Sequence, residues 1–420
     1  MASTSRIAAL AKEIEKQTTV LDKFFAEGQI PPPSFDEDAA LMYQFPPDVA
    51  EAQEALSAAL DELWWLNQGP VQTVVAKSFA TSIGLKTILK YSIQNLVPFE
   101  TGTSFEELAE KTGVPEKKLT RLLRHGIADH FFRETQPGHI KHTAATKALV
   151  IMPVLATWSQ MGMYDVGPAK MHIVDAIDKW PDSEEPNHSV SGFQIANDTD
   201  KTMFDFFEEH PERMNRFKDA MSFLQTFPGC EPSYTVKVYD WAGLGKATVV
   251  DVGGSHGLVC VALAKEFPDL QFVVQDLPKV IEDAKAKAPA ELSHRLTFQA
   301  HDFFEEQPVK NAEIYFFRWI FHDWSDKYCI KIIRALIPAL KPGARLLFSE
   351  RCLEPPCTLP LRAEKWNRDS DTTMLAMNNS QERDEDDWKA LFKAADSNII
   401  LEEVKRTPGA KLDLIVARWK

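Results

Sequence analysis

The stretch Thr248-Val249-Val250-Asp251-Val252-Gly253-Gly254-Ser255-His256-Gly257-Leu258 decides the fold of this chain. Its first half is an apolar run with the length of a buried strand, and a helical segment follows it directly. The glycines between them let the backbone turn sharply and approach a ligand closely. Ser255 and Leu258 stand where the dinucleotide pattern G-x-G-x-x-G needs glycines. The loop therefore predicts a ligand site, but not one for a pyrophosphate.

Strands and helical segments alternate through the carboxyl-terminal half of the chain. This alternation is typical of an α/β fold with a doubly wound, Rossmann-like sheet. No long helix separates the last two strands, so we expect one of them to run antiparallel at the edge. Helices are expected over Ser255 to Phe267 and Asp326 to Leu340. The predicted strands cover Thr248 to Val252, Gln271 to Gln275, Leu296 to Ala300, Ile314 to Phe317, Arg345 to Ser349, Ile399 to Val404 and Leu412 to Arg418.

The amino-terminal half is predicted to be mostly helical. Thr103 to Pro115 has the pattern of a capped helix that ends at Gly113, and a second helix and a hairpin follow at Glu116 to Gly126 and Phe131 to Thr143. This order predicts a winged-helix unit. Its basic second helix suits a DNA reader, but the acidity of the chain favours packing or dimerisation. Other helices are expected over Ser5 to Ala26, Pro47 to Asn67, Val71 to Leu89, Ile151 to Asp182 and Asp200 to Phe223.

Composition narrows the class of protein. The chain has 420 residues and a formal charge of −14, which disfavours binding to nucleic acid or to an anionic membrane surface. We find no apolar signal segment and no run of membrane-spanning length. The cysteines show neither a paired framework nor zinc spacing, which indicates reduced thiols in a cytoplasmic protein. They are Cys230, Cys260, Cys329, Cys352 and Cys357.

Acidic side chains follow the ends of three successive strands. After Asp251 in the glycine loop come Asp276, suited to two ribose hydroxyls, and Asp302, suited to an exocyclic amine. Phe303 follows and can cover a purine face. Any one of these acids is more often a helix cap than a ligand. Together they predict a nucleoside site without phosphate contacts, which suits S-adenosylmethionine (SAM).

Another strand leads into Phe317-Arg318-Trp319-Ile320-Phe321-His322-Asp323-Trp324-Ser325-Asp326. His322 and Asp323 should lie just past its carboxyl end, where ligands gather in open α/β sheets. A neutral imidazole accepts a proton near pH 7 without special tuning. Asp323 as a helix cap beside a packed aromatic cluster is the alternative, and these residues alone leave both interpretations open.

The block from Val249 to Glu350 resembles the SAM-dependent small-molecule O-methyltransferases of plants and fungi, the group of caffeic acid, flavonoid and fungal polyketide O-methyltransferases. The resemblance covers roughly Val71 to Lys420 and implies a homodimer built through the winged-helix part. It rests on four motifs: Asp251 to Gly257, Val274 to Pro278, Arg318 to Asp326 and Leu340 to Ala344.

We expect the chain to divide into four regions. Residues 1–69 form a helical extension, and 70–190 a winged-helix region for dimerisation and substrate covering. Residues 191–235 form a connecting helix, and 236–420 the SAM-binding catalytic domain.

By resemblance, His322 is the general base and is flanked by two acids, Glu350 and Glu382. Glu350 would be held against the far imidazole nitrogen. The loop that carries Glu382 departs from the family pattern at Ser380 and Gln381. No metal is implied.

The remaining candidate residues divide between the cofactor and the acceptor. The implied cofactor-binding residues are Gly253, Gly254, Gly257, Asp276, Asp302, Phe303 and Arg318. The implied acceptor-binding residues are Trp319, Met374, Asn378, Met203 and Phe207.

The predicted function is SAM-dependent methylation of a phenol or enol hydroxyl of a small secondary metabolite. N-methylation or N-hydroxy methylation on the same scaffold is an alternative. A non-methylating, pericyclase-type reaction with bound SAM is a second one, and intact His322, Glu350 and Glu382 argue against it. A SAM-bound regulator that reads DNA is a third, and the charge of −14 opposes it.

Overall fold

A computed structural model describes residues 5–78, 83–183, 190–227 and 229–420. The chain divides into two compact units, and each is built from several segments. The first comprises Met1–Tyr164, Asn215–Phe223 and Pro360–Glu364. The second comprises Asp165–Met214, Leu224–Leu359 and Lys365–Lys420.

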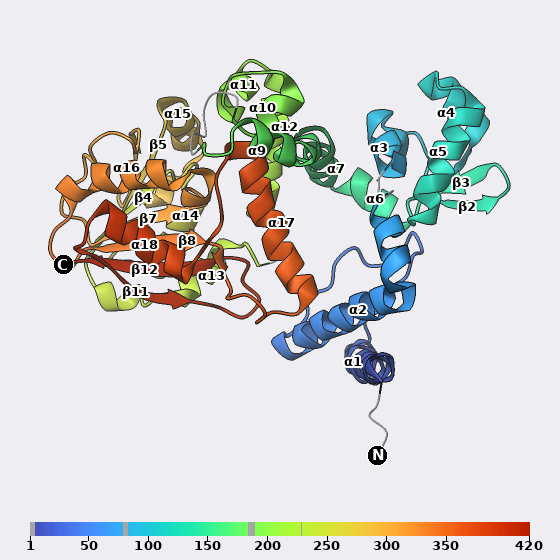
Figure 1. Ribbon diagram of the computed structural model, residues 1–420, viewed down its shortest axis with the longest axis horizontal. Helices are drawn as coiled ribbons and strands as arrows, with labels where there is room; N and C mark the ends of the chain where they lie inside the picture. The colour runs from blue at the N-terminus through green and yellow to red at the C-terminus, as the bar shows by residue number, and fades with distance from the viewer. Residues whose placement is uncertain (1–4, 79–82, 184–189, 228) are drawn as a thin grey trace. The chain divides into compact units, whose positions relative to one another are not determined.

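The second unit is built on a seven-stranded sheet with the order β11-β12-β8-β7-β4-β5-β6 (Figure 1). Five neighbouring strands, β8 to β6 in that order, are parallel, which confirms the predicted doubly wound sheet. The antiparallel strand is β12, which pairs with both β8 and β11. The expectation of an antiparallel strand at the edge is therefore wrong, because β12 lies inside the sheet and β11, which forms the edge, runs in the same direction as β8. The bounds are β4 Thr248–Val252, β5 Gln271–Asp276, β6 Leu296–Ala300, β7 Ile314–Arg318, β8 Arg345–Glu350, β11 Ile399–Lys405 and β12 Asp413–Trp419.

Alternate residues of these strands enter two separate cores. Val249 and Phe316 join a cluster with α13, α14 and α15, whereas Val250 and Phe317 join a cluster with α16 and α18. Successive side chains of a strand point to opposite faces, so an unbroken apolar run such as Val249-Val250 requires cover on both faces. The bounds are α13 Pro232–Val238, α14 Leu258–Glu266, α15 Pro278–Lys287, α16 Asp326–Leu336 and α18 Glu385–Ala395, with short 3₁₀ turns η3 Ala242–Leu244, η4 Ala290–Leu292, η5 Phe321–Asp323 and η6 Ile337–Ala339.

The first unit is mostly helical and contains a small sheet of order β1-β3-β2. The capped helix is confirmed as α4, where Ser104 and Glu107 form a capping box and Gly113 closes the helix at φ +70°. The second predicted helix is longer than expected, because α2 continues past Asn67 to Ser78. Part of the run predicted over Val71 to Leu89 lies outside the described residues. The bounds are α1 Arg6–Gly28, α2 Pro47–Ser78, α3 Ile83–Lys90, η1 Ile93–Asn95, β1 Thr103–Ser104, α4 Phe105–Thr112, α5 Glu116–Ala128, β2 Arg133–Gln136, β3 His139–Lys141, α6 Ala144–Ile151 and α7 Pro153–Met161.

Short helices make up the middle of the chain. The single helix expected over Asp200 to Phe223 is wrong: it is split into α11 and α12, because Pro211 lacks the N–H that would continue the first helix. A long helix, α17, ends at Asn378 beside the His322 turn. The bounds are η2 (π-helical) Gly162–Val166, α8 Gly167–Met171, α9 Ile173–Lys179, α10 Gly192–Asn197, α11 Met203–Glu208, α12 Pro211–Leu224, β9 Cys352–Leu353, α17 Leu361–Asn378 and β10 Arg383–Asp384.

Among the described residues, no helix combines the length and the apolar character needed to cross a membrane.

Candidate active site

A strained turn carries His322. Strand β7 ends at Arg318, and the next residue, Trp319, adopts the left-handed conformation with φ +52°. Bulky residues rarely adopt that region, and such strain persists only where surrounding contacts hold it. Glu350, at the end of the neighbouring strand β8, supplies them. Its Oε1 accepts hydrogen bonds of 2.8 Å each from the backbone N–H groups of Ile320 and Phe321.

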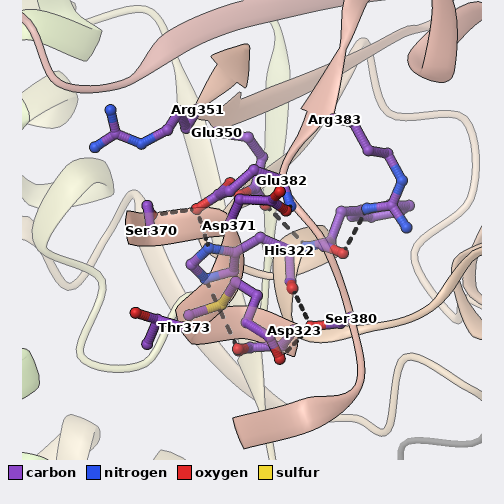
Figure 2. A network of polar contacts seen from close by, with 12 residues as sticks. His322, Asp323, Glu350, Arg351, Ser370, Asp371, Thr373, Ser380, Glu382 and Arg383 are labelled. Atoms are coloured by element: carbon purple, nitrogen blue, oxygen red, sulfur yellow. Dashed lines mark hydrogen bonds and ion pairs between the residues drawn. The ribbon is translucent and has the colours of Figure 1, made fainter. Parts of the chain in front are cut away.

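The imidazole of His322 is held by the other predicted acid. Nδ1 of His322 lies 3.3 Å from Oε1 of Glu382, and Nε2 lies 3.8 Å from Oδ1 of Asp323 (Figure 2). The expected contact of Glu350 with the far ring nitrogen is thus made by Glu382, because Glu350 Oε1 is engaged by the backbone of the turn. Glu350 Oε2 is buried without a hydrogen-bond partner within the described ranges.

Glu382 is itself fixed by α17. Its Oε1 accepts a hydrogen bond of 2.7 Å from the hydroxyl of Ser370, and its backbone N–H donates to Oδ1 of Asp371 at 3.0 Å. Its side chain is only 2% exposed, and that of His322 is 15% exposed. The ring therefore lies at a site that is closed on the Glu382 side and retains some access to solvent.

Charge and burial oppose one another at His322. Burial by itself lowers the pKa of the imidazole, but the neighbouring carboxylates of Asp323, Glu350 and Glu382 outweigh it and raise the pKa to about 10. For Glu382, burial acts in the opposite direction and raises the pKa of the carboxyl. The charge and hydrogen bond of His322 outweigh burial and leave that pKa below its usual range. The two residues consequently form an ion pair near neutral pH, and His322 must lose a proton before it can accept one.

Glu350 behaves differently from Glu382. Burial raises the pKa of its carboxyl to about 7, although the charge of His322 and the two backbone donors act to lower it. Burial likewise raises the pKa of Asp323. The carboxyl group of Glu350 is therefore partly protonated near pH 7.

His322, Glu350 and Glu382 form the group, within the described part of the chain, that has the spacing to hold a metal ion. Each offers one ligand atom, and these atoms lie within 4.8 Å of one another. Nitrogen and carboxylate ligands of this kind suit several divalent cations. The sequence implies no metal here, and that stays a prediction.

The glycine loop packs directly against the His322 turn. Gly253 has φ +73°, and a Cβ placed on it would lie 2.5 Å from Cδ1 of Ile320, two residues before His322. Gly257 has φ +70°, and a Cβ there would lie 2.9 Å from Val274 on β5. The backbone of the loop is therefore free of side-chain bulk at both positions, and the loop and the imidazole belong to one end of the sheet.

Asp276, at the end of β5, borders the same loop. Asp276 accepts hydrogen bonds from the backbone N–H of Ser255 at 2.9 Å and of Leu277 at 2.8 Å. Asp302 caps the turn after β6 by accepting from the N–H of Phe304 at 2.9 Å, and Phe303 beside it is half-buried. A glycine loop bordered by the carboxylate of Asp276 and the ring of Phe303 fits a nucleoside cofactor.

Arg318, which is expected near the adenine end of the cofactor, already contacts neighbouring residues. It donates to the backbone carbonyl of Cys230 and stacks over the ring of Trp319. Burial lowers its pKa to about 10. Two of its nitrogens, Nε and Nη1, have no hydrogen-bond partner within the described residues, so it retains donors for a ligand.

The predicted acceptor residues fall into two groups. Trp319 and Met374 are half-buried, and Asn378 donates to Oδ1 of Asp323 at 2.8 Å. Met203 and Phe207 are buried instead, and the ring of Phe207 packs in an aromatic cluster beneath α10 and α11. Their assignment to the acceptor pocket came from the family resemblance and stays a prediction.

Sequence reasoning missed the residues that support the acids. Ser370 and Asp371 of α17 hold Glu382, and Ser380 and Arg383 bind the backbone of the His322 turn. Arg383 has a sequence signal, since it directly follows Glu382. Ser370 and Asp371 have none, because they lie on a polar helix with no obvious pattern.

Comparison with known proteins decides the family. A family model described as an O-methyltransferase domain matches residues 188–397. The chain is 38% identical to the grayanic acid biosynthesis cluster O-methyltransferase of Cladonia grayi, over 99% of this chain and 88% of that protein. It is 36% identical to the chlorophenol O-methyltransferase of Trichoderma longibrachiatum, over 99% of this chain and 90% of that protein.

The chain belongs to the O-methyltransferase family. This O-methyltransferase is SAM-dependent, as the resemblance of its motifs implied.

Solved structures share the fold of this O-methyltransferase. The crystal structure of OxaC aligns with a TM-score of 0.75 at 23% identity, over 99% of this chain and 100% of that one. An enzyme described as a pericyclic reaction enzyme aligns at 0.73 and 21% identity, over 98% and 100%. The mitomycin 7-O-methyltransferase MmcR aligns at 0.67 and 23%, over 87% and 100%. Identities this low establish the common fold and do not distinguish the reactions.

Proposed function

We propose that this O-methyltransferase methylates a phenol or enol hydroxyl of a small metabolite, with His322 as the general base. One observation carries the proposal: the imidazole is fixed through Nδ1 by Glu382, at the end of the sheet where Ile320 packs on the glycine loop. A base held by one nitrogen presents the other to a substrate.

Bound SAM supplies an electrophilic methyl group. The glycine loop and Asp276 would hold its nucleoside part, with Asp302 and Phe303 at the base and Arg318 nearby. A phenol with a pKa of about 10 is largely protonated near neutral pH, so it needs a base to become a good nucleophile. Neutral His322 accepts that proton at Nε2, and Glu382 stabilises the imidazolium that forms.

Glu350 supports the base indirectly. Its hydrogen bonds to Ile320 and Phe321 keep the backbone of the strained turn in place. Of the proposed acceptor contacts, Asn378 bonds Asp323 beside His322, and Trp319 lies three residues before His322 in the same turn. Met374 lies one helical turn before Asn378 on α17.

Replacement of His322 by alanine tests the proposal. The variant should bind SAM in calorimetry as the wild type does, and should lose transfer to a phenolic acceptor by about 10²-fold or more, which is the usual contribution of a positioned base. A matched control is His294→Ala, at an exposed position outside the site. Unchanged turnover of His322→Ala would remove the imidazole from its role.

The pericyclase-type alternative has its own test. One structural neighbour is described as a pericyclic reaction enzyme, so the fold admits such chemistry. Conversion of an acceptor without formation of S-adenosylhomocysteine would support that reaction, and a mass increase of one methyl group would exclude it. Mass spectrometry of the product also separates O-methylation from N-methylation.

We further propose that helices α3 to α5 with the β2–β3 hairpin form a winged helix that serves a homodimer. The hairpin and the capped helix α4 support the winged-helix assignment. The net charge of −14 favours dimerisation over DNA binding. Sedimentation analysis gives the oligomeric state, and a monomer would contradict the second part of this proposal.

A further inference from the structure

The segment from Asn378 to Arg383 forms several hydrogen bonds with the turn that carries His322. The Asn378 amide donates to Oδ1 of Asp323 at 2.8 Å, and the Ser380 hydroxyl donates to the backbone carbonyl of His322 itself at 2.6 Å. Figure 2 shows Ser380 and Arg383 beside the turn that carries His322. The segment is thus attached both to the base and to its neighbour.

Arg383 makes the most extensive of these attachments. Its Nη1 donates to the carbonyl of Phe321 at 2.8 Å, and its Nη2 donates to the carbonyl of Trp324 at 2.9 Å. Its Nε and Nη2 also donate to Oδ1 of Asp326 at 2.9 and 2.7 Å. The residue is 1% exposed. One side chain therefore joins the residues before and after His322 to the start of helix α16.

An arginine is chemically required for this arrangement. Its planar fork presents donors at fixed positions, whereas a lysine offers a single point charge. A buried cation is costly unless its donors are satisfied, and the carbonyls of Phe321 and Trp324 satisfy them here. All three guanidinium nitrogens of Arg383 donate to acceptors within the protein, which leaves few donors for a substrate.

The contacts of Arg383 also affect Glu382, because the two residues are adjacent in the chain. Arg383 directly follows Glu382, which holds Nδ1 of His322. The same short segment therefore fixes the backbone of the base and supplies its carboxylate. Any shift of Arg383 relative to the turn alters the spacing between the imidazole and Glu382.

We propose that Arg383 is a positioning residue, which holds the His322 turn in register with Glu382 so that the imidazole meets the acceptor hydroxyl. The inference rests on the proposed role of His322 as the base. Arg383 itself need not touch the substrate or the cofactor.

Arg383→Lys is the primary test, with a chlorophenol as the probe acceptor. Misplacement of a reacting group by about 1 Å can cost about 10²-fold in rate. We expect kcat to fall at least tenfold, while the calorimetric Kd for SAM and the KM for the phenol change by less than twofold. The pH profile of kcat/KM should also move to lower pH, because a looser contact with Glu382 stabilises the imidazolium less.

Arg334→Lys is the matched control. Arg334 also donates to two backbone carbonyls, those of Ala394 and Ala395 at 3.1 and 3.3 Å, but it ties α16 to α18 away from His322. Its loss should lower the melting temperature without moving the pH profile. Ser380→Ala is a milder second variant that removes only the hydrogen bond to the His322 carbonyl, and it should lower kcat severalfold in a fully folded protein.

The outcomes separate this inference from the proposed function. If His322→Ala is inactive and both Arg383→Lys and Ser380→Ala keep the wild-type kcat and pH profile, the positioning role is wrong and the base stands. If Arg383→Lys and Arg334→Lys lower kcat equally with unchanged profiles, Arg383 is only structural and the inference is also wrong. If His322→Ala is fully active, the proposed function itself fails.

Discussion

Nδ1 of His322 lies 3.3 Å from Oε1 of Glu382, whereas Glu350 accepts its hydrogen bonds from the backbone of the turn that carries His322. The two acids that flank the imidazole therefore do different work. Glu382 contacts and orients the ring, whereas Asp323, Glu350 and Glu382 together raise its pKa. Glu350 fixes the backbone of the turn that carries the ring.

Glu382→Gln should change the pH dependence of turnover. The neighbouring carboxylates raise the pKa of His322 to about 10, and only the neutral ring can accept a proton, so kcat/KM of the wild type should rise with pH through the alkaline range. Loss of the Glu382 charge lowers that pKa and moves the rise to lower pH. We also expect a lower plateau, since the imidazolium is less stabilised. A profile that overlays the wild type would contradict the role of Glu382.

Glu350→Gln should stabilise the fold at alkaline pH. The pKa of this carboxyl is raised from 4.5 to about 7, so the folded state binds more protons than the unfolded state between these values. Stability is therefore lost as pH rises through that window, at about 1.4 kcal/mol per pKa unit and by about 3 kcal/mol in total. Glutamine removes this loss and keeps an oxygen for the backbone donors.

Chemical denaturation at pH 5 and pH 8 measures the effect of Glu350→Gln. The variant should gain stability over the wild type at pH 8 and show little gain at pH 5. Glu266→Gln, at an exposed position, controls for the loss of one negative charge from an acidic chain. An equal difference in stability between variant and wild type at the two pH values would contradict a raised pKa of Glu350 in the folded protein.

Gly253→Ala should weaken the binding of SAM. A Cβ at this position would lie 2.5 Å from Cδ1 of Ile320, and the residue has φ +73°, which costs a non-glycine residue about 1–2 kcal/mol. We expect the Kd for SAM to rise tenfold or more. Gly343→Ala is a matched control, because Gly343 has φ +83° and no atom within 4 Å of the added Cβ. It should lose stability but not affinity. Equal affinities for the two variants would contradict the position of the loop at the cofactor.

Asp276→Asn should weaken SAM and S-adenosylhomocysteine alike. Hydrogen bonds to a charged group contribute about 1.5–3 kcal/mol each, so loss of the charge should raise both Kd values by about tenfold or more. Asp269→Asn, at an exposed position before β5, should bind both as the wild type does. A selective loss of SAM alone would place Asp276 near the methyl group rather than the ribose.

Much of the sheet could be predicted, because buried strands leave a simple pattern. The run Val249-Val250 requires cover on both faces, and the structure supplies a core on each. The split of the helix at Pro211 also had a local signal, the missing N–H of a proline, which the prediction overlooked. The extension of α2 to Ser78 had none, since Gly69-Pro70 predicts a stop there.

The site was harder to predict, because its contacts join distant parts of the chain. The motif around His322 predicted the base, but the partner of Nδ1 depends on where the segment after α17 lies. Ser370 binds an atom more than ten residues away in the sequence, so no local pattern reveals it. Arg383 is marked by its place directly after Glu382, but that place does not show that it binds the backbone of the His322 turn. Met203 and Phe207 are buried, and their place at the acceptor stays a prediction.

The proton transfer to His322 is tested most directly by acceptors of different acidity. At pH 8, His322→Ala and the wild type are compared at saturating SAM on an ordinary phenol and on a polychlorinated phenol that is already ionised. We predict a loss of about 10²-fold or more for the ordinary phenol and a loss of only a few fold for the ionised one, which needs no base. Equal losses for the two acceptors would contradict the assignment of His322 as the base.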